Sequence, residues 1–113
     1  MRCVIFHVDE AASLPLALGN AANLRAYYEA QGQPCVAELL VNGPAVTALT
    51  PADGGAAALE KAMAEGLAVA ACANALRVNG LAPSALLPGI TVVPAGVVEL
   101  AERQAQGWAY IKP

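Results

Sequence analysis

Short apolar segments rich in valine and isoleucine alternate along this sequence with longer segments rich in alanine and leucine. The short segments predict strands at residues 2–8, 35–41, 67–72, 90–93 and 108–112. The first four lack a clean alternation of polar and apolar residues, which is typical of strands buried on both faces. Strand and helix in repeated order, with short connections, indicate a parallel sheet covered by helices. We therefore predict a three-layer α/β/α fold with a mainly parallel sheet of about five strands.

The longer segments carry apolar residues at the three- and four-residue steps of a helix. The first of them has Ser13 as its predicted N-cap, and its repeating positions are Leu14, Leu18, Ala21, Leu24 and Tyr28. Further helical segments are predicted at about residues 44–50, 56–65, 73–79, 83–87 and 97–106. In the last of these, one face is predicted to hold Val97, Leu100, Ala101 and Gln104.

The length and the charge of the chain limit its organisation and its partners. Its 113 residues are a common size for one domain, so we predict a single domain over residues 1–113. Six Lys and Arg residues scattered over a chain of net charge -3 argue against nucleic-acid binding, because phosphate contacts need clustered positive charge. Only 13% of the residues are charged, against a usual fraction of about 25%. A surface so poor in charge predicts a homo-oligomer, in which other copies of the chain cover part of it.

Three cysteines, Cys3, Cys35 and Cys72, lie far apart in the sequence. Their odd number and wide spacing suit neither a disulfide framework nor a paired metal site, so we expect reduced thiols in the cytoplasm. Cys3 and Cys35 fall at strand starts and are expected to be structural. No run of ~20 apolar residues predicts a membrane span. With one histidine, no P-loop lysine and no G-x-G-x-x-G pattern, neither a metal nor another cofactor is expected.

Ligands of open parallel sheets bind beyond the carboxyl ends of the strands, so the residues leaving each predicted strand are the site candidates. They are His7, Asp9, Asn42, Cys72, Asn74, Pro94 and Gly96, with Arg77 about one helical turn beyond the cysteine. Cys72 is the most informative candidate. At a strand-to-helix junction its sulfur would lie beside free N–H groups that favour a thiolate, and Arg77 would add to this effect. The alternative is a small buried residue in an alanine-rich segment.

The other candidates have a functional and a structural interpretation. His7 and Asp9 would position a ligand or carry protons beside Cys72, because we expect the first and third strands to be near neighbours. A strand-end histidine is, however, more often a hydrogen-bonded structural residue. The segment that begins at Asn42 would offer N–H groups to an anion, or would form a turn into a helix. Gly96 would bind a phosphate at a helix start.

Several motifs carry a resemblance to one known family, most of them in the second half of the chain. They are Phe6-His7-Val8-Asp9-Glu10, Cys72-Ala73-Asn74-Ala75-Leu76-Arg77, Leu86-Leu87-Pro88-Gly89, Val92-Val93-Pro94-Ala95-Gly96 and Trp108-Ala109-Tyr110-Ile111-Lys112-Pro113. In these segments the chain resembles the small proteins of the DsrE/DsrF-like family. The resemblance implies an α/β/α fold and assembly into dimers, trimers or hexamers. It also implies, in some members, a cysteine that carries sulfur as a persulfide, and Cys72 matches the position of that cysteine.

Two functions of different classes are therefore expected. The first is a cytoplasmic sulfur-relay protein in which Cys72 accepts sulfur from a donor protein and passes it to an acceptor. In that case Arg77 supports the thiolate, and the pocket residues are His7, Asp9, Asn42, Asn74, Pro94 and Gly96. The second is a non-catalytic oligomeric module of the same fold that binds a small ligand or a partner protein. The sequence contains no conventional catalytic motif. If this protein has an activity, the one that we expect is sulfur transfer.

Overall fold

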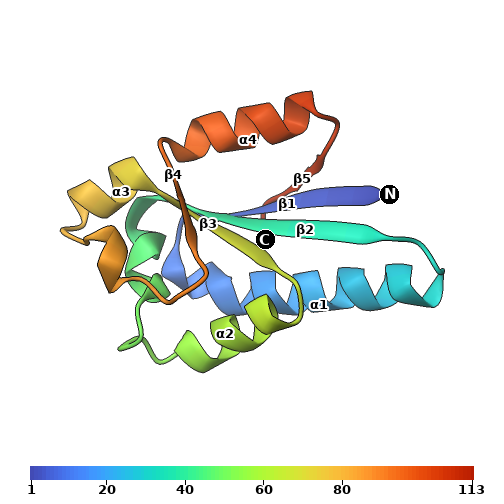
Figure 1. Ribbon diagram of the computed structural model, residues 1–113, viewed down its shortest axis with the longest axis horizontal. Coiled ribbons are helices and arrows are strands. Elements are labelled where there is room, and N and C mark those ends of the chain that lie inside the picture. Colours follow the sequence, from blue (N-terminus) through green and yellow to red (C-terminus); the bar gives the residue numbers. More distant parts are fainter.

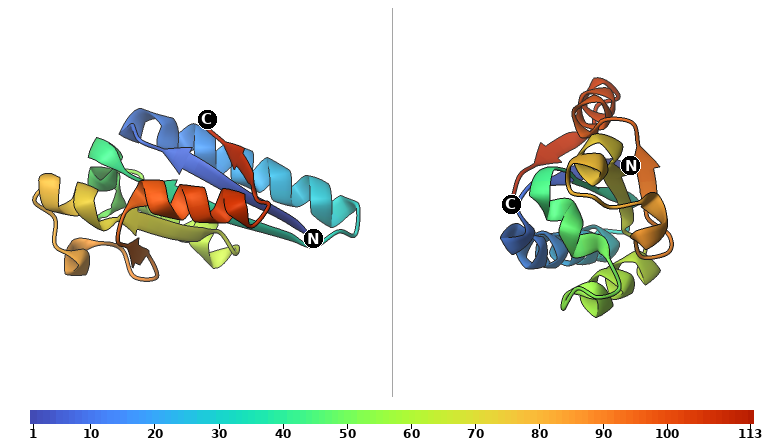
Figure 2. Two further views of the ribbon diagram at one scale, coloured as in Figure 1. Left: turned by 90° about the horizontal axis from the view of Figure 1, so that it is seen from above. Right: turned by 90° about the vertical axis from the view of Figure 1, so that its left-hand side faces the viewer.

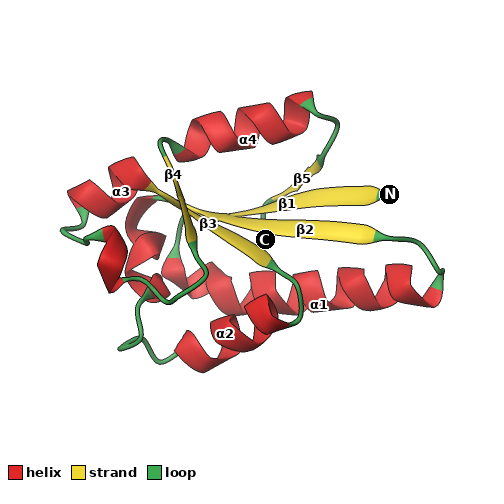
Figure 3. Ribbon diagram, in the orientation of Figure 1, coloured by secondary structure: helices red, strands yellow, loops and turns green.

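Five parallel strands form one sheet in the order β4-β3-β2-β1-β5. The computed structural model describes residues 1–113. The strands are β1 (Arg2–Val8), β2 (Cys35–Val41), β3 (Ala68–Cys72), β4 (Thr91–Val93) and β5 (Ala109–Ile111). Each lies within one residue of its predicted bounds, and the predicted α/β fold with a parallel sheet is confirmed (Figures 1 and 3).

Four α-helices and three short 3-10 helices connect the strands. The α-helices are α1 (Leu14–Ala30), α2 (Ala56–Ala64), α3 (Ala73–Val78) and α4 (Gly96–Ala105), and the 3-10 helices are η1 (Ala11–Ser13), η2 (Gly43–Leu49) and η3 (Pro83–Ala85). Ser13 precedes α1 as predicted, but its side chain makes no capping hydrogen bond, because η1 continues directly into the helix and gives Ser13 a helical backbone. None of these helices is long and apolar enough to cross a membrane.

The two faces of the sheet are covered unequally. Helices α1 and α2 lie on one face, whereas α4 lies alone on the other (Figures 1 and 2). The main core of 22 buried residues includes Leu14 of α1 and Leu59 of α2, and the core beneath α4 has four buried residues. Most of the hydrophobic stabilisation therefore comes from the side that carries α1 and α2.

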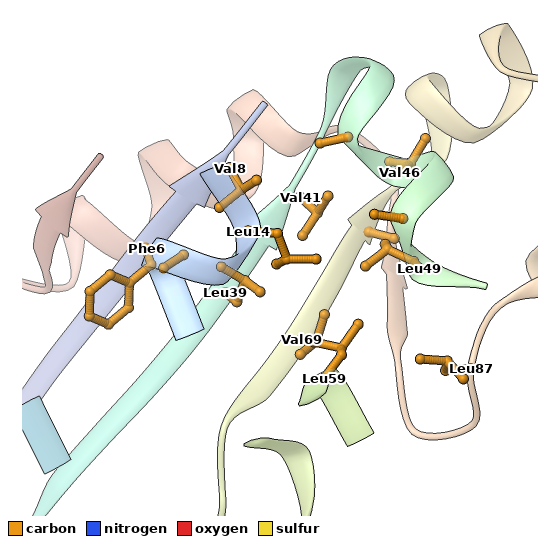
Figure 4. Packing of buried hydrophobic residues seen from close by; sticks show 14 of the residues in the cluster. Phe6, Val8, Leu14, Leu39, Val41, Val46, Leu49, Leu59, Val69 and Leu87 are labelled. Atoms are coloured by element: carbon orange, nitrogen blue, oxygen red, sulfur yellow. The ribbon is translucent and has the colours of Figure 1, made fainter. Parts of the chain in front are cut away.

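Alternate residues of the central strands point to the two cores, as the period of a strand requires. Phe6 and Val8 of β1 and Leu39 of β2 belong to the main core, where they lie on the side of Leu14 and Leu59 (Figure 4). Ile5 precedes Phe6 and Leu40 follows Leu39, and both pack with Leu100 of α4 in the smaller core. Both faces of these strands are thus apolar, which explains why their sequences show no polar alternation.

The four residues that the sequence places on one face of α4 are not buried together. Leu100 is buried, but Val97 is 70% exposed, and Ala101 and Gln104 are also exposed. The residues that face the sheet with Leu100 include Gly96 and the pair Glu99 and Arg103. Because Arg103 pairs with a buried carboxylate of β2, the helix presents its charged stripe to the sheet and leaves Val97 and Val98 in solvent. The homo-oligomer that would cover such valines stays a prediction.

The buried carboxylate is Glu38 of β2, which is only 3% exposed. Its Oε1 accepts a hydrogen bond of 2.9 Å from Nε of Arg103, which also donates to Oε2 of Glu99 at 3.2 Å. The Arg103 guanidinium lies over the ring of Trp108, 4.5 Å from its centroid. Burial, followed by the neighbouring carboxylate of Glu99, raises the pKa of Glu38 from 4.5 to about 7. Glu38 is therefore neutral in the folded protein over a pH range in which it is ionised in the unfolded chain.

This raised pKa predicts a loss of stability with rising pH. The neutral carboxyl stabilises the fold fully below pH 4.5, and this contribution is lost as the pH rises through about 7. We expect Glu38→Gln, which imitates the neutral form, to gain on the wild type by up to roughly 3 kcal/mol between pH 4.5 and pH 8. Urea unfolding of both proteins across this range measures the difference. A constant difference at every pH would show that Glu38 ionises normally.

Candidate functional site

The candidate site lies at the edge where the parallel strands end, which we call the carboxyl rim. His7 is near the end of β1, Asn42 follows β2, Cys72 ends β3, and Gly96 opens the helix after β4. Since all the strands run in the same direction, these positions share one edge of the sheet. The predicted placement of the candidates follows from the parallel topology.

Cys72 is both the last residue of β3 and the N-cap of α3. Its Sγ accepts a hydrogen bond from the backbone N–H of Ala75 at 3.4 Å. The backbone at Cys72 is extended, and the helix begins at the next residue, so the side chain turns back over the first turn of α3. The cysteine is 6% exposed and packs against the main core. The structure thus unites the two predicted features, an N–H donor on the sulfur and burial.

Asn74 and Arg77 form a separate pair on the outer side of α3. The guanidinium of Arg77 donates to Oδ1 of Asn74, and both residues are exposed. The hydrogen-bond partner of the Cys72 sulfur is the Ala75 backbone, and Arg77 makes no hydrogen bond to that sulfur. Because the partner of Arg77 is Asn74, its charge is held at the surface and not at the thiol.

His7 joins three strands through its two ring nitrogens. Nε2 lies 2.9 Å from Oδ1 of Asn42, and Nδ1 lies 2.7 Å from the hydroxyl of Tyr110 on β5. An amide oxygen only accepts, so with Asn42 in this orientation Nε2 carries the proton and the Tyr110 hydroxyl donates to Nδ1. β2 lies between β1 and β3, which places their axes about 10 Å apart. His7 therefore bonds to its neighbours Asn42 and Tyr110, as in the structural interpretation, and makes no hydrogen bond to Cys72.

Asp9 and Lys112 form an ion pair beyond the ends of β1 and β5. Nζ of Lys112 lies 2.8 Å from Oδ1 of Asp9, and this hydrogen bond lowers the pKa of Asp9 and raises the pKa of Lys112. Both side chains are more than 40% exposed, so the pair adds little to stability. The sequence does not predict Tyr110 and Lys112 as site residues. They reach the site because β5 lies beside β1, and only the sheet order shows this.

Gly96 allows α4 to begin directly against the end of β2. A Cβ atom at this position would lie 3.1 Å from Cβ of Asn42 and 3.2 Å from Cδ1 of Leu40. No larger residue fits without moving one of these neighbours. Pro94, two residues before Gly96, is exposed. The structure therefore brings Gly96, Asn42, His7 and Tyr110 into one connected group.

A second link connects this group with α3, the helix whose N-cap is Cys72. The side-chain amide of Asn79, at the end of α3, donates to the carbonyl oxygen of Ala75 at 2.8 Å and to that of Gly43 at 3.5 Å. Gly43 follows Asn42 and has φ +56°, and a Cβ there would lie 3.3 Å from the carbonyl oxygen of Asp9. The loops after β1 and β2 and the end of α3 are therefore packed together along the carboxyl rim.

The carboxyl rim offers no metal ligand set. Nowhere in the structure do three or more His, Cys, Asp or Glu side chains come together as metal ligands would. Two cavities, of about 110 and 100 Å³, lie away from the rim. The first lies between α1 and α2 and is lined in part by Leu18, Arg25 and Cys35, and the second lies beside Glu38. At the rim itself, the chemistry available is that of a thiol with an N–H donor and, two strands away, a hydrogen-bonded histidine.

A parallel α/β domain with a cysteine at the carboxyl end of its third strand defines a class of small proteins. Comparisons with known proteins identify the family. The model of the DsrE/DsrF-like family matches residues 3–113, so the chain belongs to this family. A solved structure of a protein of unknown function from Methanobacterium thermoautotrophicum is similar over 100% of both chains, with 30% identity and a TM-score of 0.90. A search of curated proteins finds no match.

The close approach at Gly96 predicts a specific cost of substitution. We expect Gly96→Ala to lower the free energy of unfolding by about 1–3 kcal/mol, because Asn42 or Leu40 must move. The matched control is Gly19→Ala in the middle of α1, where a Cβ meets nothing within 4 Å. There we expect a gain of about 0.5–1 kcal/mol from helix propensity. Urea unfolding measures both, and effects of the same sign would contradict the assigned contact.

Proposed function

We propose that this protein carries sulfur as a persulfide on Cys72. The observation that carries the proposal is the contact of the Cys72 sulfur with the Ala75 N–H at the carboxyl rim. An N–H directed at sulfur stabilises negative charge there, and the thiolate is the reactive form of a cysteine. Membership of the DsrE/DsrF-like family supports the proposal, because sulfur relay is an association of that family.

The proposed reaction is a transfer between thiols that needs no external oxidant. The Cys72 thiolate attacks the outer sulfur of a donor persulfide, the sulfur–sulfur bond of the donor breaks, and the donor leaves as a thiolate. Cys72 then holds the outer sulfur as a persulfide. In the second step an acceptor thiolate attacks that outer sulfur, and Cys72 leaves as a thiolate. The Ala75 N–H stabilises the charge on Cys72 before the first step and after the second.

Access to the sulfur requires a local movement, because Cys72 is only 6% exposed. Helix α3 has six residues, and the hydrogen bond from Asn79 to Gly43 links its end to the loop after β2. The helix also buries Ala75 and Leu76 in the main core, but one short element can open at a lower cost than global unfolding. We therefore assign to this helix the opening that admits a donor.

Mass spectrometry after incubation with a low-molecular-weight persulfide tests the proposal. We expect the native protein to gain the mass of one sulfur atom, because Cys72 is the one thiol at the carboxyl rim that accepts a backbone N–H, and we expect Cys72→Ser to gain none. Cys3→Ser and Cys35→Ser are the matched controls and should gain as much as the wild type. If Cys72→Ser takes up as much sulfur as the wild type, sulfur is carried elsewhere and the assignment fails.

The burial of Cys72 favours a second candidate, a non-catalytic module that binds a ligand or a partner. Alkylation by a maleimide separates the two functions. For the relay we expect Cys72 to react in the native protein, more slowly than the less buried Cys3, and to react faster in Asn79→Ala, which loses the link to Gly43. Val78→Ala, at an exposed position of the same helix, is the control and should leave the rate unchanged. Reaction of Cys72 only after denaturation would favour the binding module.

A further inference from the structure

The second cavity lies on the side of the sheet that α4 covers incompletely. It has a volume of about 100 Å³ and is lined in part by Glu38, Ala70, Thr91, Glu99 and Arg103. α4 lies over β1 and β2, whereas the cavity walls come from β2, β3, β4 and α4. This cavity has no residue in common with the carboxyl rim, so it is separate from the proposed sulfur site.

Small side chains on β3 leave this space open. Ala68 is paired with Glu38 across the sheet, and Ala70 is paired with Thr91, so these four residues face the same side. An alanine in place of a larger residue leaves a hollow next to the carboxyl group. At about 30 Å³ for each water molecule, the cavity takes a group of about three or four heavy atoms.

An unpaired polar atom marks the inner wall of the cavity. Oε1 of Glu38 accepts from Arg103, but Oε2 has no hydrogen-bond partner and almost no contact with solvent. Buried polar atoms without a partner are rare, because each costs the full desolvation of the group. The Glu99 carboxylate, whose side chain is 19% exposed, belongs to the outer part of the same cavity. Two carboxylates thus meet a single guanidinium, whose Nε serves both of them.

The charges indicate the class of ligand. With Glu38 and Glu99 ionised and Arg103 positive, the cavity has one uncompensated negative charge, so an anion is excluded. Two carboxylates without a third ligand do not make a metal site. An ammonium group supplies one positive charge and several N–H donors for Oε2 of Glu38, the carboxylate of Glu99 and the hydroxyl of Thr91. The apolar wall that includes Ala70 suits a short alkyl chain.

We propose that this cavity binds a small primary ammonium ion between the carboxylates of Glu38 and Glu99. The ion replaces the proton that neutralises Glu38 in its absence, and that proton goes to the solvent. Glu99 and Arg103 of α4 are the charged groups that act on Glu38. The strands beside it contribute the uncharged residues Ile5 and Ala68 at its level.

Ethylammonium is the probe, and ethanol is its neutral counterpart of the same size. In a titration of the full chain at pH 8 followed by amide NMR, we expect saturable shifts around Ala70 and Thr91 with ethylammonium and none with ethanol. Because the pKa of Glu38 is about 7, the affinity should be about tenfold lower at pH 6 than at pH 8. Calorimetry in two buffers of different ionisation enthalpy should show one proton released at pH 6.

Two variants test the site, and one controls for general charge. Glu38→Gln should weaken ethylammonium binding at least tenfold at pH 8, whereas Glu102→Gln, at an exposed position of α4, should leave it unchanged. Ala68→Leu fills the cavity from the exposed start of β3 and should abolish binding while the urea unfolding curve stays cooperative. The proposal is overturned if ethylammonium causes no saturable shifts at pH 8. It is also overturned if ethylammonium binds Glu38→Gln with the same affinity as the wild type. Sulfur uptake by Cys72 is a separate readout, so either proposal can fail alone.

Discussion

The structure depends on a central strand, β2, that is buried on both faces. Leu39, Leu40 and Val41 have exposures of 1%, 0% and 0%, and successive side chains point to opposite layers. Burial of this kind requires helices on both faces of the sheet and a neighbouring strand on each side, and here these neighbours are β1 and β3, both parallel to β2. Because the strands are parallel, their carboxyl ends lie along one edge, the carboxyl rim.

The interior of this strand also holds the one buried acidic side chain of the protein. Glu38 lies among apolar residues of β2 and its carboxyl group accepts a hydrogen bond from Arg103 of α4, so this contact joins the helix to the sheet. Such a contact adds little net stability, but a packing of α4 that removed Arg103 would leave the buried carboxyl group without this partner, which is costly. The exposed Val97 and Val98 show the result, since the charged stripe of α4 and not its valines faces the sheet.

Cys72 has a structural role and, in the proposed function, a chemical one. Its backbone ends a strand, its sulfur caps the helix that follows, and its side chain fills part of the main core. The same contact that holds the sulfur in place prepares it to bear a negative charge. In a sulfur carrier this combination would keep the thiol protected until a partner opens α3. In a binding module it would simply complete the core.

The sequence by itself determined the strands, the helical segments and the parallel topology, because each depends on local periodicity and on the length of the connections. It also placed Cys72 and Gly96 at the carboxyl ends of strands, where parallel topology collects them. Only the tertiary structure decided that β5 lies beside β1, which brings Tyr110 to His7 and Lys112 to Asp9 across 103 residues of sequence. It also decided the rotation of α4, since the pairing of Glu38 with Arg103 joins residues 65 positions apart. Contacts between such distant residues depend on how the layers pack, and no local pattern records that packing.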